Sequence, residues 1–207
     1  MKVTSRAIQN NKRIPEANAA GVPGPSGPVP GQNKSPHISW SDFPANTKSF
    51  AIIVHDPDVP SKPDDVNKSD RTVPYNLPRV DFYHWVLVDI PANMTALAEG
   101  QDSDGFTPKG KKPGKVAYGV RGINNYKEWF GNDPQMGGDY GGYDGPWPPF
   151  NDERLHHYHF TVYALDVPSL KMPDRFNGPD ALKAMQGHIL DKATLIGTYA
   201  LNPNPRD

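Results

Sequence analysis

Four stretches of the chain carry the apolar pattern of β-strands. Residues 48–57 (KSFAIIVHDP) are apolar at odd and even positions alike, which is typical of a strand covered on both faces. Residues 81–91 (DFYHWVLVDIP) share this pattern and are rich in aromatic and β-branched side chains. Residues 156–168 (HHYHFTVYALDVP) predict the longest strand, and residues 193–201 (ATLIGTYAL) predict a fourth strand near the end of the chain.

One helix is predicted between the last two strands. The sequence NGPD at residues 177–180 provides a start signal, with proline near the first turn and an acid beside it. Leu182, Met185 and Ile189 then follow at helical spacing. This apolar stripe indicates packing against a core.

The segments between these elements indicate the fold class. They are loops rich in Gly, Pro, Asn and Asp, and the chain of 207 residues contains 24 prolines and 19 glycines. Because the connections are too loop-like for βαβ units, we expect a mainly antiparallel β-domain with a few peripheral helices. The length suits a single domain over residues 1–207.

Residues 1–35 differ from the rest and predict a Pro/Gly-rich N-terminal arm. The stretch GVPGPSGPVPGQ at residues 21–32 cannot be helical, so we expect it to wrap the body in extended form. The N-terminus has no apolar stretch typical of a signal peptide, and no apolar run approaches the ~20 residues that span a bilayer. We therefore expect a cytoplasmic protein without a transmembrane segment.

Charge and composition argue against several classes of function. The formal net charge is −1, so there is no broad basic field for nucleic acid, and KGKKPGK at residues 109–115 is expected to be a solvated loop. The chain has no cysteine, which excludes disulfides, Cys-ligated zinc and a cysteine nucleophile. It also lacks the G-x-S-x-G and H-E-x-x-H motifs of hydrolases and metalloproteases.

Three of the seven histidines fall within residues 156–159, and strand alternation separates them. His156 and Tyr158 share a face with apolar residues further along the strand, so we expect them to point toward the core. His157 and His159 share the opposite face. An H-x-H pair on a strand can hold a metal, but two ligands are too few. We favour a solvated strand face for this pair over a metal site.

Polar residues also occur in or just after two other predicted strands, those at residues 48–57 and 81–91. Asp56 and Asp58 flank Pro57, and these residue types by themselves favour a turn. His84 shares its parity with Phe82 and lies inside the strand at residues 81–91. From the residues alone, His84 is either a hydrogen-bonded core group or part of a pocket wall.

Several motifs, taken in order, resemble the phosphatidylethanolamine-binding protein family, also called the Raf kinase inhibitor-like proteins, and within it the bacterial branch. The resemblance covers about residues 35–200 and is carried by SPHISWSDFP (35–44), IIVHDPDVP (52–60), YHWVLVDIP (83–91), GGYDGPWPP (141–149), LHHYHFTVYALD (155–166) and AMQGHILDKATLIGTY (184–199).

This resemblance implies a central antiparallel sheet packed on a smaller second sheet, with helices near the C-terminus. It also implies a small cavity that accepts anions, including phosphate groups and phospholipid headgroups. Carried over by position, the residues of that cavity are Asp56, Asp58, His84, Pro148, Pro149, His156 and Tyr158. The resemblance further suggests a cis Asp56–Pro57 bond that turns both carboxylates into the cavity.

The sequence departs from the family pattern around the expected cavity. His157 replaces the arginine of an H-R-Y motif, on the face expected to point away from the cavity. Trp147 stands where bacterial relatives often have cysteine, and Phe150 and Asn151 replace Lys-Gly after the proline pair. We expect Trp147 and Phe150 to narrow or re-line the mouth.

The function expected from these observations is non-enzymatic binding of a phosphate-bearing small molecule or phospholipid headgroup, without a cofactor or metal and with regulation through a protein partner. In this hypothesis the carboxylates favour charged His84 and His156, which donate free N–H groups to the anion, with Tyr158 as a neutral donor. One alternative is a hydrolase that uses the same Asp, His and Tyr side chains with a metal. Another is a kinase- or protease-inhibitor module. Bacterial relatives suggest a homodimer.

Overall fold

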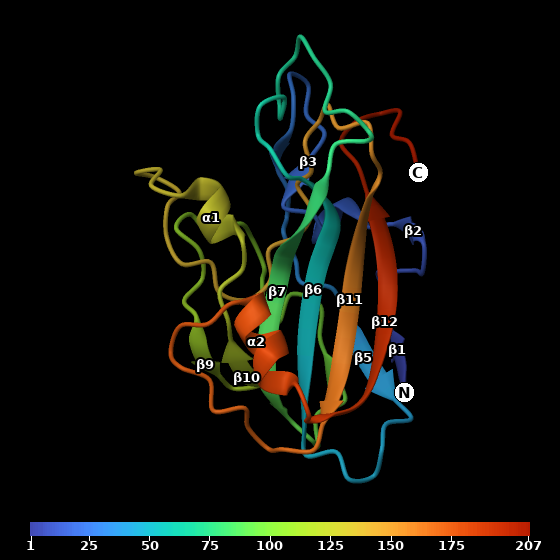
Figure 1. Cartoon of the computed structure of the whole chain (residues 1–207), viewed down its shortest axis with the longest axis vertical. Coiled ribbons are helices and arrows are strands. Elements are labelled where there is room, and N and C mark those ends of the chain that lie inside the picture. Colours follow the sequence, from blue (N-terminus) through green and yellow to red (C-terminus); the bar gives the residue numbers. More distant parts are fainter.

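The computed structural model describes all residues from 1 to 207 and is built around one seven-stranded sheet (Figure 1). Its strand order is β2-β12-β11-β6-β7-β10-β9, and every neighbouring pair is antiparallel except β2 and β12. The strands are β2 (Lys12–Arg13), β12 (Ile189–Tyr199), β11 (His156–Leu165), β6 (Ser49–Pro60), β7 (Arg79–Pro91), β10 (Gly119–Arg121) and β9 (Gly114–Val116).

Two smaller sheets complete the β-structure. One is the antiparallel sheet β1-β5-β8, formed by β1 (Lys2–Thr4), β5 (Ile38–Ser41) and β8 (Ala96–Leu97). The other pairs β3 (Gly21–Val22) with β4 (Val29–Pro30). The helices are the short 3-10 helix η1 (Glu16–Asn18), α1 (Tyr126–Phe130) and α2 (Gly178–Met185). None of them has the length and apolar character needed to cross a bilayer.

The large sheet is apolar on both faces. On one face a cluster of 20 buried residues, among them Trp40, Phe50 and Trp85, joins the large sheet to the sheet β1-β5-β8. On the other face α2 packs against the strands through Ala181 and Met185. Burial on both faces is the reason that the central strands read as nearly continuous apolar runs. The expected fold class, a mainly antiparallel β-protein with a second sheet and few helices, is confirmed.

The four predicted long strands are all present, but β11, expected to be the longest, ends at Leu165 and is the shortest of the four. The predicted helix is also shorter than its pattern suggests. Asn177 caps α2 through a capping box with Asp180, as the start signal indicated. The helix ends at Met185, and Ile189 begins β12 instead of extending the apolar stripe. Gly187 has a φ of 81°, a left-handed conformation that glycine adopts without strain and that redirects the chain into the strand.

Residues 1–35 lie against the body of the molecule in mostly extended form. Ile8 and Ile14 are buried in the main core, and β2 adds to the sheet beside β12. Farther along, the amides of Ala20 and Gly21 both donate to the carbonyl of Pro146. This segment therefore supports the proline-rich loop that precedes β11.

Candidate functional site

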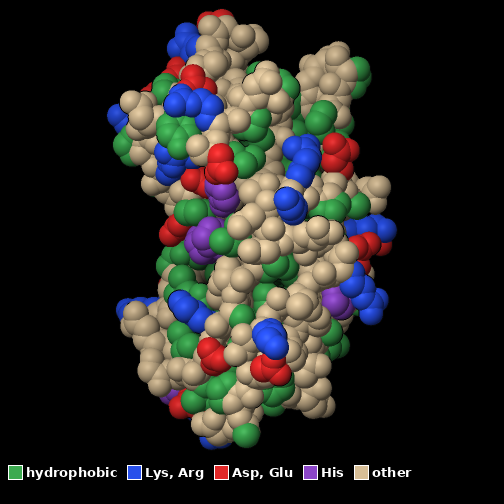
Figure 2. Space-filling view, turned by 90° about the vertical axis from the view of Figure 1, so that its right-hand side faces the viewer, with side chains coloured by type: hydrophobic (Ala, Val, Ile, Leu, Met, Phe, Trp, Pro, Cys, Tyr) green, Lys and Arg blue, Asp and Glu red, His purple; other side chains and the backbone are tan.

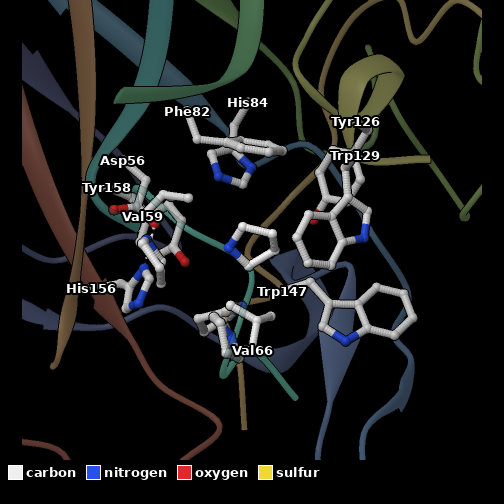
Figure 3. A pocket seen from close by; sticks show the side chains of 14 residues that line it. Asp56, Val59, Val66, Phe82, His84, Tyr126, Trp129, Trp147, His156 and Tyr158 are labelled. Atoms are coloured by element: carbon white, nitrogen blue, oxygen red, sulfur yellow. Dashed lines mark hydrogen bonds and ion pairs between the residues drawn. The ribbon is translucent and has the colours of Figure 1, made fainter. Parts of the chain in front are cut away.

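A pocket of about 160 Å³ opens where β6, β7 and β11 reach the proline-rich loop (Figure 3). Six of the seven residues predicted from the sequence line it, and Asp58 is the exception. Its lining residues are Asp56, Val59, Pro60, Pro63, Val66, Phe82, His84, Tyr126, Trp129, Trp147, Pro148, Pro149, His156 and Tyr158.

Strand alternation places the side chains of β11 as expected. His156 and Tyr158 are each 1% exposed and point into the pocket wall, whereas His157 and His159 lie half-buried on the opposite face. On β7, Val80, Phe82 and His84 follow the same alternation, with His84 deepest. Strands β11 and β7, which lie on either side of β6 in the sheet, therefore supply the histidine and tyrosine side chains of the site.

His156 is held between two carboxylates. Its Nδ1 lies 2.6 Å from Oδ2 of Asp56, and its Nε2 lies 3.1 Å from Oδ2 of Asp152. Burial alone lowers the pKa of His156, but these two carboxylates outweigh it and raise the pKa to about 9. The ring is therefore an imidazolium at neutral pH, and both of its N–H groups are already donated. The hypothesis that His156 offers a free N–H to an anion is wrong.

Asp152 was missed by the sequence reasoning although it completes this arrangement. Besides accepting from His156, it binds Arg79 through two contacts, at 2.6 and 3.0 Å. Both side chains are almost fully buried. Asp152 lies four residues before His156 in an irregular segment, where neither strand period nor a motif identifies it. Asp56, His156, Asp152 and Arg79 thus form a buried chain of alternating charges.

Asp58 lies beside the pocket instead of lining it. Its carboxylate accepts from the backbone N–H of His157 at 3.0 Å and lies 2.9 Å from that ring's Nδ1. Arg154 donates to its other oxygen at 3.3 Å. The strand register shifts between Asp56 and Val59, and this irregularity separates the two carboxylates that simple alternation would place together.

The peptide bond between Asp56 and Pro57 is trans, so the prediction of a cis bond is wrong. Strand β6 continues through Pro57 to Pro60, and the carboxylate of Asp56 reaches the pocket from this extended backbone. Its Oδ1 accepts a hydrogen bond from the amide of Asp58 at 2.8 Å. This local contact holds the Asp56 side chain without a cis bond.

His84 is the neutral histidine of the site. Its Nδ1 lies 2.8 Å from the carbonyl oxygen of Asp144, and because a carbonyl only accepts, we assign the proton to Nδ1. Burial lowers the pKa of His84 to about 4, and the opposing effect of Asp56 does not offset it. The remaining ring nitrogen, Nε2, has no hydrogen-bond partner within the protein. In a pocket-lining residue, that nitrogen is an acceptor available to a ligand.

Tyr158 supplies the hydroxyl of the site. Burial, reinforced by the charge of the nearby Asp56 carboxylate and by hydrogen bonding to it, raises the pKa of Tyr158 well above its usual value. Its phenol therefore keeps its proton at every physiological pH and can donate to a ligand. The Tyr158 ring meets His84 edge to face, with the ring centroids 5.1 Å apart. This contact fixes both rings relative to each other.

The support behind His84 is a second buried charge cluster. Asp144 is fully buried, and its carboxylate accepts from Lys111 at 2.7 Å, Asn33 at 2.7 Å and Asn124 at 2.8 Å. Burial raises the pKa of Asp144, against the lowering effect of Lys111. The expectation that residues 109–115 form only a solvated loop is therefore wrong for Lys111. The charge of one lysine among the several of residues 109–115 gives no sign that a buried aspartate lies opposite it.

Aromatic side chains form the wall opposite the polar residues (Figure 3). Trp147 lines the pocket as expected, but Phe150 does not. Tyr126 and Trp129 come from α1, a five-residue helix that the sequence reasoning did not predict. The helix is too short for an apolar period to reveal it.

The histidines on the outer face take part in ordinary surface contacts. His157 is bound by Asp58 and lies 3.3 Å from Asp207, and the rings of His55 and His159 lie 5.1 Å apart. No three metal-ligating side chains in the chain are arranged to hold a metal ion. Figure 2 shows histidines at the surface among interspersed acidic and basic side chains.

Comparison with known proteins identifies relatives along nearly the full chain. The sequence model described as phosphatidylethanolamine-binding protein matches residues 4–200. A "UPF0098 protein" of Aquifex aeolicus is 31% identical over 96% of this chain and 88% of its own length. A protein of the same name from Methanothermobacter thermautotrophicus is 32% identical over 96% of this chain and 98% of its own length.

Two solved structures share the fold. Escherichia coli YbcL, described as a new member of the mammalian PEBP family, superposes with a TM-score of 0.68 at 25% identity, covering 96% of this chain and 97% of that one. CT736 of Chlamydia trachomatis, described as a putative phosphatidylethanolamine-binding protein homolog, gives a TM-score of 0.64 at 29% identity over 95% of each chain.

Proposed function

The chain belongs to the phosphatidylethanolamine-binding protein family, and from this premise we propose that it is a non-enzymatic binding protein. Its pocket receives the phosphate group of a phospholipid headgroup or of a small phosphorylated molecule. The observation that carries the proposal is the pair of polar groups that face the ligand space beside Asp56. These are the hydroxyl of Tyr158 and Nε2 of His84.

The charges around the floor determine in which protonation state phosphate binds. The Asp56 carboxylate repels an anion, but the imidazolium of His156 compensates its charge. Neutral His84 presents a lone pair, which also repels an unprotonated phosphate oxygen. A proton between His84 and the phosphate removes this repulsion and creates a charge-assisted hydrogen bond. We therefore expect phosphate to bind together with a proton.

The same residues argue for binding over catalysis. The pocket-lining residues include no serine, threonine or cysteine, and the raised pKa of Tyr158 makes its phenol a poor nucleophile. The imidazolium of His156 has both N–H groups engaged, and the lowered pKa of His84, about 4, makes its free Nε2 a weak base toward water. These features support a site that holds its ligand unchanged.

Calorimetric titration of glycerol 3-phosphate and of glycerophosphoethanolamine tests the proposal, with ³¹P NMR of the ligands recovered afterwards. We expect both to bind and to be recovered intact. Tyr158→Phe removes one charge-assisted hydrogen bond and should weaken binding about tenfold or more. Tyr163→Phe is the matched control, because Tyr163 lies on the same strand and packs on the other face of the sheet.

Three other results of these titrations would contradict the proposal. If neither phosphate ligand binds, the pocket is not a phosphate site. If the recovered ligand is cleaved, the hydrolase alternative replaces the binding proposal. If Tyr163→Phe weakens binding as much as Tyr158→Phe, the loss comes from the sheet and not from the pocket hydroxyl.

A further inference from the structure

The pocket has two halves of different chemistry (Figure 3). Its polar half consists of Asp56, His84, His156 and Tyr158. Its aromatic half consists of Tyr126, Trp129 and Trp147, which lie across the pocket from Asp56 and Tyr158. Phosphate binding by the polar half does not involve the aromatic half, although the aromatic half makes up the opposite wall of the pocket.

Trp147 is held firmly with one face against the N-terminal segment. A Cβ placed on Gly21 would overlap three atoms of the indole, so the glycine backbone packs directly on the ring. Phe106 meets the same indole edge to face at a centroid distance of 5.9 Å. Because Trp147 also lines the pocket, the arm fixes a flat aromatic surface toward the ligand space.

Trp129 forms the outer part of the aromatic half. Although tryptophan has the largest of the apolar side chains, Trp129 is 50% exposed. Its exposed side chain is part of the pocket wall. Val80, which is 48% exposed, pairs across strands with the pocket-lining Val59 and extends the apolar rim. An exposed tryptophan next to a ligand cavity is the kind of group that a bound ligand covers.

The aromatic half attracts positive charge but offers no carboxylate to accept from N–H groups. Asp56 is the only acid among the lining residues, and it lies on the opposite side. The hydroxyl of Tyr126 donates to the carbonyl of Gly145, and its oxygen is the one side-chain acceptor of the aromatic half. A primary ammonium has three N–H groups, and it would exchange its hydrogen bonds to water here for at most one to the Tyr126 oxygen. A quaternary ammonium has no N–H to satisfy, and it is stabilised by the ring faces.

We propose that the aromatic half is a subsite for a quaternary ammonium, so that the preferred ligand carries a phosphate and a trimethylammonium group, as phosphocholine does. This inference rests on the proposed function, because the phosphate in the polar half places the ammonium opposite. The preference over a primary ammonium arises in Tyr126, Trp129 and Trp147, and not in the phosphate contacts.

Calorimetry of phosphocholine against phosphoethanolamine at one pH and ionic strength tests the subsite. We expect phosphocholine to bind about tenfold more tightly, as cation–π contacts in a desolvated site imply. Its methyl proton resonances should also shift upfield, since they lie over indole rings. Equal affinities, or tighter binding of phosphoethanolamine, overturn the inference while leaving the proposed function intact. Failure of both ligands to bind overturns the proposed function itself.

Variants of Trp129 separate ring chemistry from apolar bulk. Trp129→Phe keeps a π-face and should retain most of the preference for phosphocholine, whereas Trp129→Leu keeps apolar bulk and should lose it. Phosphoethanolamine affinity should stay nearly constant in both. Because Trp129 is half exposed, neither change threatens the fold. Retention of the full preference in Trp129→Leu contradicts the assignment.

Gly21→Ala tests the role of the arm in holding Trp147. The added methyl group must displace the indole, so the preference for phosphocholine should fall while glycerol 3-phosphate still binds. An unchanged preference contradicts the positioning role of Gly21. A final comparison with dihexanoyl phosphatidylcholine identifies the source of the headgroup: tighter binding than phosphocholine assigns an intact lipid, and weaker binding assigns the free monoester.

Discussion

Nδ1 of His156 lies 2.6 Å from the carboxylate of Asp56, although a hundred positions separate the two residues in the chain. Each is 1% exposed, and the contact joins β11 to β6 at the pocket floor. It neutralises the charge that Asp56 would otherwise present to an anion. It also removes His156 from the set of free ligand donors, which leaves that role to Tyr158 and His84.

Asp152→Asn should destabilise the protein strongly, because it leaves the charges of Arg79 and His156 without their shared carboxylate. Breaking a buried ion pair of this kind costs about 3 kcal/mol of unfolding free energy. Urea unfolding at neutral pH measures the loss. Asp64→Asn, an exposed aspartate, is the control and should change stability little. A loss below about 1 kcal/mol would show that His156 does not need Asp152.

Asp152→Asn should also lower the pKa of His156 from about 9, since one of its two carboxylate partners disappears. A raised pKa in the folded state stabilises the protein below the unfolded value of 6.5, and this contribution is lost as the pH rises through about 9. NMR titration of the His156 ring measures the shift directly. A pKa of His156 near 6.5 in the wild type would contradict its placement between the carboxylates of Asp56 and Asp152.

His84 should make the protein sensitive to mild acid. Its pKa is about 4 in the folded state against 6.5 in the unfolded chain, so the unfolded state binds the proton first as the pH falls. Stability attributable to His84 is complete above pH 6.5 and decreases by roughly 3 kcal/mol as the pH falls through about 4.

Comparison with His84→Gln isolates this effect from the other titrating groups. The difference in unfolding free energy between wild type and variant, measured at several pH values, should change only between 6.5 and 4. A difference that stays constant over that range would mean that His84 titrates normally in the folded protein.

Asp58→Asn should reduce stability without changing ligand affinity. The Asp58 carboxylate accepts from His157 and Arg154, so we expect a loss of about 1–3 kcal/mol in urea unfolding. Because Asp58 does not line the pocket, the affinity for glycerol 3-phosphate should stay within about twofold of wild type. An affinity loss as large as that of Tyr158→Phe would show that Asp58 takes part in ligand binding.

Lys111→Met should cost about 3 kcal/mol of stability, because the fully buried Asp144 loses its cationic partner. Lys112→Met is the matched control: the neighbouring lysine is exposed and makes no ion pair. Thermal unfolding of both variants measures the contrast. Equal melting temperatures would contradict a structural role of the Lys111–Asp144 pair.

The sequence was sufficient to predict the sheet and one face of the site. The central strands are recognisable as continuous apolar runs because both of their faces are buried. The two-residue period of a strand then places His156 and Tyr158 on the inner face. The same period applied to β6 places Asp56 and Asp58 together, which the register shift after Asp56 prevents. An irregularity of this kind depends on the partner strand and leaves no mark in the local pattern.

The parts of the site that were missed come from irregular chain. Asp152 lies in a segment without a repeating pattern, and Trp129 lies in a helix of five residues. Whether His156 can donate to a ligand depends on Asp152, which occupies its Nε2, and this contact is seen only in the folded structure. Motif resemblance located the pocket residues, but it could not assign protons to them.

The most direct test of the account is the number of protons taken up when a phosphodiester binds. Glycerophosphoethanolamine is suited to this because its phosphate does not titrate near neutral pH, so any proton comes to the protein. Titrations at pH 7 in buffers of different ionisation enthalpy should give net proton uptake in the wild type and none in His84→Gln. Binding without proton uptake in the wild type would contradict the central claim that neutral His84 receives phosphate together with a proton.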